Sequence, residues 1–315
     1  MKLVFTFAYP LLLSGCSLQS QQMSSYLSLV FFVMALVFAV IWGRRLRAMR
    51  NAGGNWSWPR PIEVLIGSVT DFFDTLGIGS FAPSTAFFRL AKLVPDELIP
   101  GTLNVGHTLG TITQALIFIQ IVDVAPMTLL PMIVAAGTGA WLGTAVVGRL
   151  PRFQIQISMG VAMLLAAVIM LCSMLGLMPA GADGLALTGW RWWVGVLGNF
   201  GLGLLMPMGI GLYAPCMILV SLLGMSPLAA FPIMMGSCAF LMPISSLGFI
   251  NNQRYAVSAA LGLAIGGVPA VLLAAYIVKS LPLDYVRWIV VVVVMLVGAS
   301  MLRSAYTERQ REKVA

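Results

Sequence analysis

The sequence predicts an all-α polytopic membrane protein made of two inverted repeats, each a re-entrant (broken-helix) hairpin plus three transmembrane helices, with one extra N-terminal helix. Composition is the first reason, because 60% of the 315 residues are hydrophobic and only 9% are charged, too few to cover a soluble surface. The second is a series of apolar runs long enough to span a bilayer. The third is a motif that occurs twice, as GIGSFAP at 77–83 and GIGLYAP at 209–215.

The two motif copies belong to a longer duplication. The shift that places Gly77 on Gly209 also places Pro95 on Pro227, and aligned prolines are unlikely to recur by chance. Glycine and proline interrupt the apolar pattern at the same place in both halves. In membrane carriers built from repeats, such paired interruptions are the best indicator of the binding site in a sequence.

The N-terminal region contains one further helix. Residues 1–25 form an apolar lead or a signal segment, and the run from Leu13 to Cys16 resembles a lipobox, in which case Cys16 would carry a lipid. The alternative is a short lead-in to the first transmembrane helix. That helix is an apolar run over 26–42, and the basic segment that completes the region 26–60 predicts a cytoplasmic loop.

The first repeat covers 61–175 and begins with a hairpin. Its two arms, 61–76 and 82–93, are each short for a full crossing, so we expect a re-entrant hairpin with the glycines at its tip, shielded by protein or lining a wet cavity. Three full spans should follow. We expect them at 100–121, 126–148 and 153–175.

The second repeat, 191–303, follows a linker at 176–190 that carries no Lys or Arg and is therefore predicted to be periplasmic. Its hairpin arms are 191–207 and 214–224, and residues 304–315 form a cytoplasmic tail. Its spans are expected at 228–249, 256–278 and 286–302. A hairpin plus three spans is an odd number of crossings, and so is five if each hairpin is two tilted spans. The halves must therefore insert in opposite orientations.

The net charge of +8 is concentrated in short segments between apolar runs. This is the positive-inside pattern of cytoplasmic loops, and no soluble basic and aromatic domain suggests nucleic-acid binding. The four cysteines show neither CxxC spacing nor a cluster, so we expect free thiols, no structural metal and no cofactor. The basic residues of these segments are Arg44, Arg45, Arg47, Arg50, Arg60, Arg303, Arg309, Arg311 and Lys313.

A duplicated chain whose halves each open with Gly-x-Gly and Pro inside a broken helix resembles the TauE/SafE sulfite exporter family, over about 60–303. The resemblance implies a proton-driven secondary carrier in a bacterial inner membrane. Its substrates would be sulfur-containing anions such as sulfite, sulfoacetate, thiosulfate or a related organosulfonate. The chain departs from the family's glycine-rich pattern at Ser80 and Leu212, which restricts close backbone approach at the tips.

Both tips are candidate anion sites. A helix that starts after a glycine break presents unpaired N–H groups and a partial positive charge. The alternative is that the glycines only allow close helix packing. The candidate ligands are the backbone at Gly77, Gly79, Gly209 and Gly211 and the side chains of Ser84, Thr85 and Cys216.

Acidic residues follow one face of the first hairpin arm. Glu63, Asp71 and Asp74 recur at helical spacing, and at a rise of ~1.5 Å per residue both aspartates lie deep in a ~30 Å hydrocarbon core. A charge at that depth is costly unless it is neutralised, so Asp71 and Asp74 are candidate proton carriers. The alternative is that Asp74 caps a nearby helix, or pairs with Arg89 or Lys92 and holds the hairpin shut.

A polar stripe follows the first full span, made of Asn104, His107, Thr111 and Gln114 at spacings of three and four residues. His107 is the single histidine of the chain and can act as a proton relay or as a hydrogen-bond donor to an anion. Asn104 is a further candidate ligand. The alternative for His107 is a satisfied contact between helices.

The function we predict is a proton-coupled exporter or importer of a small sulfur anion that works by alternating access between the two halves. A passive anion channel is the main alternative. A membrane-embedded enzyme is the weaker one, because the sequence has no HExxH, GxSxG or P-loop motif. Import versus export, the coupling ion and assembly as a homodimer stay open at this point.

Overall fold

The computed structural model describes residues 3–52, 57–122, 124–147, 150–177, 184–209, 211–277 and 284–314. In this part of the chain the fold is all-α, as predicted, with eleven α-helices and two short 3-10 helices. The single β contact among these residues is an isolated bridge between Gly184 and Met225. Ile210 of the second motif and 178–183 of the predicted linker lie outside the described residues.

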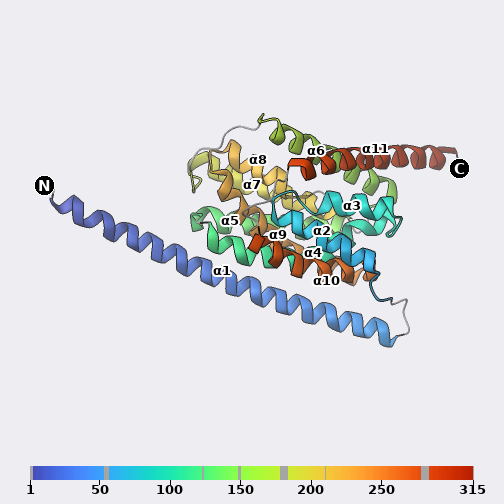
Figure 1. Cartoon of the computed structure of the whole chain (residues 1–315), viewed down its shortest axis with the longest axis horizontal. Helices are drawn as coiled ribbons and strands as arrows, with labels where there is room; N and C mark the ends of the chain where they lie inside the picture. The colour runs from blue at the N-terminus through green and yellow to red at the C-terminus, as the bar shows by residue number, and fades with distance from the viewer. Residues whose placement is uncertain are drawn as a thin grey trace.

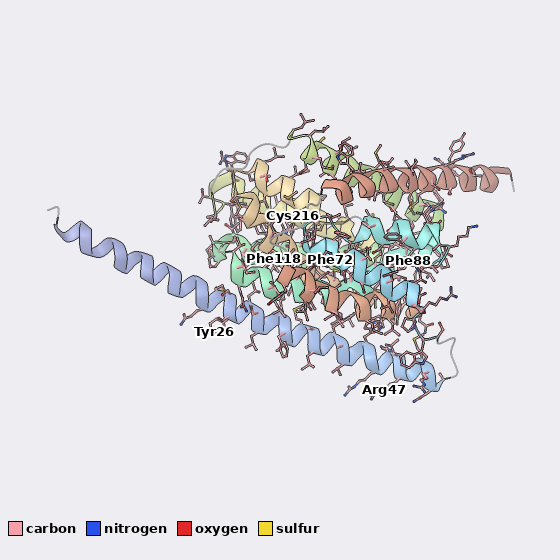
Figure 2. All side chains as sticks on the ribbon, in the orientation of Figure 1. Tyr26, Arg47, Phe72, Phe88, Phe118 and Cys216 are labelled. Carbon is pink, nitrogen blue, oxygen red and sulfur yellow. The ribbon has the colours of Figure 1, made fainter. Side chains whose placement is uncertain are left out.

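Helix α1, Leu3–Asn51, is one continuous helix of 49 residues, so the predicted boundary between a lead at 1–25 and a helix from 26 is not a helix boundary. It crosses one side of the bundle (Figure 1). Phe31 and Phe38 are buried against the bundle, whereas Tyr26 is 66% exposed and points away from it (Figure 2). The side chain of Cys16 lies outside the described part, so the lipobox remains a hypothesis.

The helix is interrupted at both motif copies. In the first half α2 (Pro61–Thr75) ends before the motif and α3 (Phe81–Leu90) begins inside it. In the second half α7 (Gly189–Leu205), the 3-10 turn η2 (Met206–Met208) and α8 (Tyr213–Leu222) repeat this arrangement. Helices α2, α3, α7 and α8 have 10 to 17 residues, too short to cross a ~30 Å core comfortably.

Six long helices follow the interruptions, and their ends lie within a few residues of the predicted spans except at the last helix, which continues through the predicted tail to Val314. Five helices of the described chain, α1 among them, are long and apolar enough to cross a membrane. The spans predicted at α4 and α11 are not among those five and stay predictions. The long helices are α4 (Ile99–Ile121), α5 (Pro126–Val147), α6 (Arg152–Met174), α9 (Pro227–Asn251), α10 (Val257–Ile277) and α11 (Asp284–Val314), and the 3-10 helix η1 (Asp96–Leu98) precedes α4.

The opening arm of each hairpin packs on a helix of the other half. Helix α2 lies along α10 and α7 lies along α5, while α4 packs on α9 and α6 on α11; Figure 1 shows α6 and α11 side by side at one edge of the bundle. A Cβ at Gly139 of α5 would overlap the Phe200 carbonyl of α7, so this contact is backbone to backbone. Small residues allow such close approach between membrane helices, and it brings both tips to the centre of the bundle.

Candidate functional site

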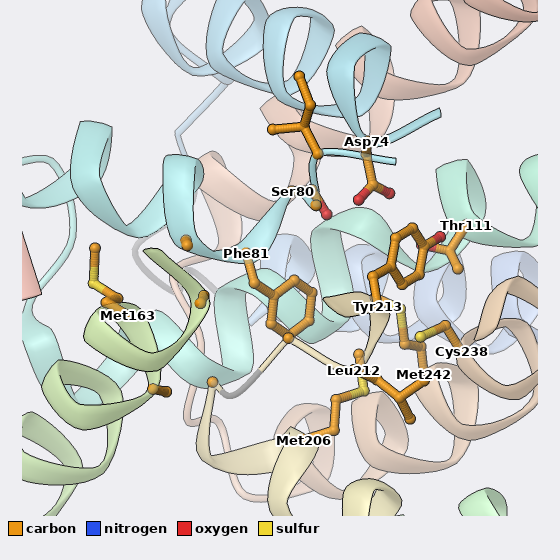
Figure 3. Close-up of a pocket in the computed structure, with 17 residues that line it drawn as sticks. Asp74, Ser80, Phe81, Thr111, Met163, Met206, Leu212, Tyr213, Cys238 and Met242 are labelled. Atoms are coloured by element: carbon orange, nitrogen blue, oxygen red, sulfur yellow. The ribbon is translucent and has the colours of Figure 1, made fainter. Parts of the chain in front are cut away.

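A cavity lies between the two helix interruptions (Figure 3). Its volume is about 60 Å³, in a measure in which one water needs roughly 10–15 Å³, so it has room for a few waters or one small ion. The two tips supply most of its wall, and α4, α6 and α9 complete it. The lining residues are Asp74, Ile78, Gly79, Ser80, Phe81, Ala82, Thr111, Ala162, Met163, Ala166, Met206, Gly209, Gly211, Leu212, Tyr213, Cys238 and Met242.

The polar groups of this wall are few and mostly neutral. Ser80, Thr111 and Tyr213 contribute hydroxyls and Cys238 contributes a thiol, whereas Asp74 is the single carboxylate among the described lining residues. No Lys, Arg or His is among them. Small-ligand sites in proteins commonly have such a wall, apolar with a few placed polar groups.

The backbone at the tips differs between the two motif copies. Gly79 has φ +88° and Gly209 φ +90°, in the left-handed region, whereas Gly211 is not among the residues with positive φ. A Cβ at Gly79 would meet nothing within 4 Å, while one at Gly211 would lie 3.8 Å from the Phe81 Cβ. The tips therefore approach each other closely, and α3 and α8 both begin at the cavity wall.

A hydrogen-bond chain joins the two tips across α4. The Tyr213 hydroxyl donates to Gln114 Oε1 at 2.5 Å, and Gln114 Nε2 donates to Asp74 Oδ2 at 2.9 Å and to Thr75 Oγ1 at 3.1 Å. Thr75 gives its own hydrogen to the Asp71 carbonyl, so it can only accept from Gln114. That bond assigns the orientation of the Gln114 carboxamide in this structure.

A second chain runs beside the cavity. His107 Nδ1 lies 2.6 Å from Asp71 Oδ1, and His107 Nε2 lies 3.0 Å from Ser84 Oγ. All three side chains are buried, and the Phe81 ring lies close to the imidazole. An imidazole between a carboxylate and a hydroxyl can hold a proton and exchange it with either neighbour.

The second oxygen of Asp71 occupies space that two glycines leave open. Asp71 Oδ2 is buried and has no hydrogen-bond partner. A Cβ at Gly110 of α4 would lie 2.5 Å from this oxygen, and a Cβ at Gly267 of α10 would overlap it. Any larger residue at either position would displace the carboxylate, so these glycines determine where Asp71 can sit.

The structure places some of the predicted site residues at the cavity and others away from it. Asp74, Gly79, Gly209 and Gly211 line the cavity. Gly77 instead lines a neighbouring, largely apolar cavity.

The predicted side-chain ligands are buried outside the cavity lining. Ser84 and His107 belong to the Asp71 chain. Thr85 Oγ1 donates to the Phe81 carbonyl, and Asn104 Nδ2 donates to the Pro100 carbonyl. Cys216 is fully buried and has a free thiol, so it packs in the core near the second tip.

The alternative partner for Asp74 is not the one found. Arg89 Nη2 donates to Ser304 Oγ at 2.6 Å, and Arg89 Nη1 lies 3.6 Å from Asp96 Oδ2. Asp74 instead accepts from Gln114 Nε2 and from the backbone N–H of Ser80 at the start of α3, so it does contact the end of a nearby helix. The carboxylate at the cavity wall therefore has neutral donors in place of a cation.

Sequence reasoning missed Ser80, Tyr213 and Cys238 as lining residues. Tyr213 was detectable, because it stands where the first copy has Phe81, and a hydroxyl added in one copy of a repeat is a chemical difference. Cys238 carried no such signal. It lies on α9, far from the motif in the sequence.

Comparison with known protein families gave one match, to a family described as sulfite exporter TauE/SafE, over residues 64–301. The comparisons with curated proteins and with solved structures gave no significant match. The matched stretch contains both motif copies, both hydrogen-bond chains and the whole cavity wall, and it covers most of the chain. The protein therefore belongs to the TauE/SafE family of sulfite exporters, which are membrane transporters of sulfur-containing anions.

Proposed function

We propose that this protein is a proton-coupled secondary transporter that binds a small sulfur-containing anion in the cavity between the two tips. It would work by alternating access between two inverted halves, in a bacterial inner membrane and with its C-terminus in the cytoplasm. One observation carries the proposal. The cavity that both tips enclose is lined by a carboxylate and by no basic residue of the described chain.

An anion and an ionised Asp74 repel each other in so small a space. Two like charges about 5 Å apart repel by about 3 kcal/mol at an effective dielectric constant of about 20. Protonation of Asp74 removes this repulsion, so anion binding and proton binding favour each other. Transport should therefore increase as the pH falls on the side from which the anion binds.

Neutral donors would hold the anion. The first turns of α3 and α8 point their backbone N–H groups toward the tips. The hydroxyls of Ser80, Thr111 and Tyr213 lie in the cavity wall. This set binds an oxyanion without a permanent ion pair, which favours release. The cavity volume of about 60 Å³ suits sulfite or thiosulfate better than a long-chain organosulfonate.

A second cavity offers a route to the outer face. It has a volume of about 180 Å³ and lies among the end of α6, the start of α11 and the first tip. It shares Ile78, Ala82 and Ala166 with the central cavity. These three apolar side chains would form the outer gate. The basic ends of α1 and α11 would place the opposite face of the bundle in the cytoplasm.

The buried chain through His107 would store or pass a proton. Asp71 and Asp74 are one helical turn apart on α2, and His107 contacts Asp71 directly. A proton can therefore remain near Asp74 without residing in the cavity. This supports coupling in the first half, where both acids lie.

Flux into proteoliposomes tests the proposal, using sulfite, thiosulfate, sulfoacetate and sulfate with and without an imposed pH gradient. We expect accumulation of at least one sulfur anion against its gradient when the pH gradient is present. Flux that stops at equilibrium under every gradient would instead establish the passive channel. Absence of flux for all four anions, with correctly inserted protein, would contradict transport of this substrate class.

A further inference from the structure

We propose that Tyr213 and Gln114 couple the protonation of Asp74 on the first tip to anion binding by the second tip. This inference rests on the proposed function and assigns it one anion-binding residue, Tyr213, and one positioning residue, Gln114. The hydrogen-bond chain joins three helices, because Asp74 is on α2, Gln114 on α4 and Tyr213 on α8. All three side chains are buried.

The bond directions identify one state of the chain. Gln114 Nε2 faces Asp74 and Thr75, and Gln114 Oε1 faces Tyr213. A carboxylate can only accept, so this orientation is the one that an ionised Asp74 requires. In this state the Tyr213 hydroxyl donates its hydrogen to Gln114 Oε1, so that hydrogen is not available to a ligand.

Protonation of Asp74 permits the opposite orientation. The carboxamide then turns, so that Gln114 Oε1 accepts from the new carboxyl O–H and Nε2–H donates to the Tyr213 oxygen. The Thr75 hydroxyl, which in this structure donates to the Asp71 carbonyl, has to turn at the same step and donate to Gln114 Oε1. The Tyr213 hydrogen is released and can point into the cavity, whose wall includes Tyr213 (Figure 3). One proton enters from solvent and stays on Asp74, and no covalent bond breaks.

The released hydroxyl hydrogen would be a donor to the anion. The cavity wall then gains a hydrogen bond at the same step in which it loses a negative charge, so both changes favour anion binding. The duplication emphasises the point, because the first tip has Phe81 where the second has Tyr213, and the shift that aligns the halves places Ser246 on Gln114. The hydrogen-bond chain can therefore run only from Asp74 of the first tip to Tyr213 of the second tip.

Other titratable groups face Asp74 and belong to the same electrostatic environment. Asp71 lies on its own helix, His107 on α4, and Tyr213 and Cys238 on α8 and α9. Helix α10, which packs along α2, has Tyr276 as its one titratable residue, and this side chain is 92% exposed. The test must therefore separate the pH effect that depends on Tyr213 from the effects of these other titratable groups.

The test compares the KM for anion uptake at about pH 6 and about pH 8 in proteoliposomes. The probe is thiosulfate or sulfoacetate, whichever gives the larger flux, because both keep their charge over this range. In the wild type the ratio of the two KM values should be large. In Tyr213→Phe the KM at about pH 6 should rise roughly tenfold, the contribution of one hydrogen bond to a charged group, while the KM at about pH 8 changes little.

Gln114→Asn provides a second variant with an opposite signature. The shorter side chain cannot bridge both tips, so the Tyr213 hydroxyl is free at either pH, and we expect the KM at about pH 8 to fall. Tyr255→Phe is the matched control, because its hydroxyl is also buried and accepts from Trp42 Nε1 at 3.3 Å, outside the cavity wall. Its KM ratio should equal that of the wild type.

Two results would overturn the inference. One is an equal rise of KM at both pH values in Tyr213→Phe, which indicates a structural role. The other is an unchanged KM ratio in both variants. Either result would leave the proposed function intact, because wild-type accumulation under a pH gradient tests that function separately.

Discussion

The two hairpins share a backbone interruption and differ in chemistry. The opening arm of the first hairpin, α2, buries Glu63, Asp71 and Asp74. In the opening arm of the second hairpin, α7, the buried residues of the described chain are Gly195, Asn199 and Gly203. Shifting one motif onto the other places Asp71 on Gly203 and Asp74 on Met206. The two tips nevertheless enclose one cavity together.

The difference separates two tasks that a transporter must perform. Both tips supply helix ends and close backbone approach, so the duplicated part of the sequence builds the cavity. One tip alone supplies carboxyl groups, so in the proposed mechanism a change in their protonation acts from one side of the cavity. A single proton on the first half can then alter a site formed by both halves.

The packing of the two arms differs in the same way. Helix α7 meets α5 through backbone contacts at Gly139 and Gly203, and α2 meets α10 through a backbone contact at Gly266. The α2–α10 interface has in addition the Asp71 carboxylate beside Gly267. The first interface therefore has to accommodate a polar group within closely packed helices.

The largest effect is expected for Asp74→Asn, which removes the carboxylate at the cavity wall. One proton moving with each anion allows a pH difference of one unit to drive about a tenfold gradient, and this accumulation should be lost while downhill flux continues. Asp96→Asn is the control, because Asp96 is also buried but accepts from Gln156 at 2.9 Å, outside the cavity wall. Full accumulation in Asp74→Asn would place the coupling in another group and remove the contrast between the tips.

Gly267→Ala should have the next largest effect, on stability. Its Cβ would overlap Asp71 Oδ2, and such overpacking typically costs about 1–3 kcal/mol. Gly201→Ala in α7 is the matched change, because a Cβ there meets nothing within 4 Å and alanine is the better helix former by up to about 1 kcal/mol. Thermal unfolding in detergent measures both. Equal melting temperatures would show that the Asp71 carboxylate moves aside for the added methyl group without cost.

His107→Gln should reduce both stability and the response to pH. It disrupts the contacts to Asp71 and Ser84 and leaves buried polar atoms unpaired, at a cost of about 1–3 kcal/mol. Asn199→Ala in the second arm removes bonds to the Met132 carbonyl and Ser237 at a similar cost. The pH profile of flux distinguishes them, because only the His107 variant should change it. An identical profile in both would reduce His107 to a packing residue.

The smallest effect concerns the tip glycines. Gly79→Ala places a Cβ on a residue with φ +88°, which costs about 1–2 kcal/mol, whereas Gly211→Ala meets only an ordinary contact at 3.8 Å and should cost less than about 0.5 kcal/mol. Chemical denaturation compares the two variants. A larger loss for Gly211→Ala would mean that the second tip, and not the first, is the more constrained.

Much of the architecture could be predicted because bilayer crossing imposes simple requirements. The ends of α4, α5 and α9 follow from the lengths of apolar runs, and the interruptions follow from glycine and proline, which act locally. The same reasoning placed a helix boundary near residue 25, where α1 in fact continues.

The site was only partly predictable. Asp74 and the glycines Gly79, Gly209 and Gly211 were identified from depth and from the motif, and they line the cavity. Helical spacing also placed Asp71 and His107 in polar stripes on two different helices, but their contact depends on how α2 crosses α4. Ser84 was predicted as a ligand and instead bonds His107.

The sequence by itself determined the membrane-like composition, the duplication, the two interruptions and the family, because these depend on local composition and order. Only the tertiary structure decided that α2 and α7 each pack on a helix of the other half, that Tyr213 reaches Gln114 and that Cys238 joins the wall. These contacts join residues far apart in the chain, and helix packing, not sequence spacing, sets which of them meet.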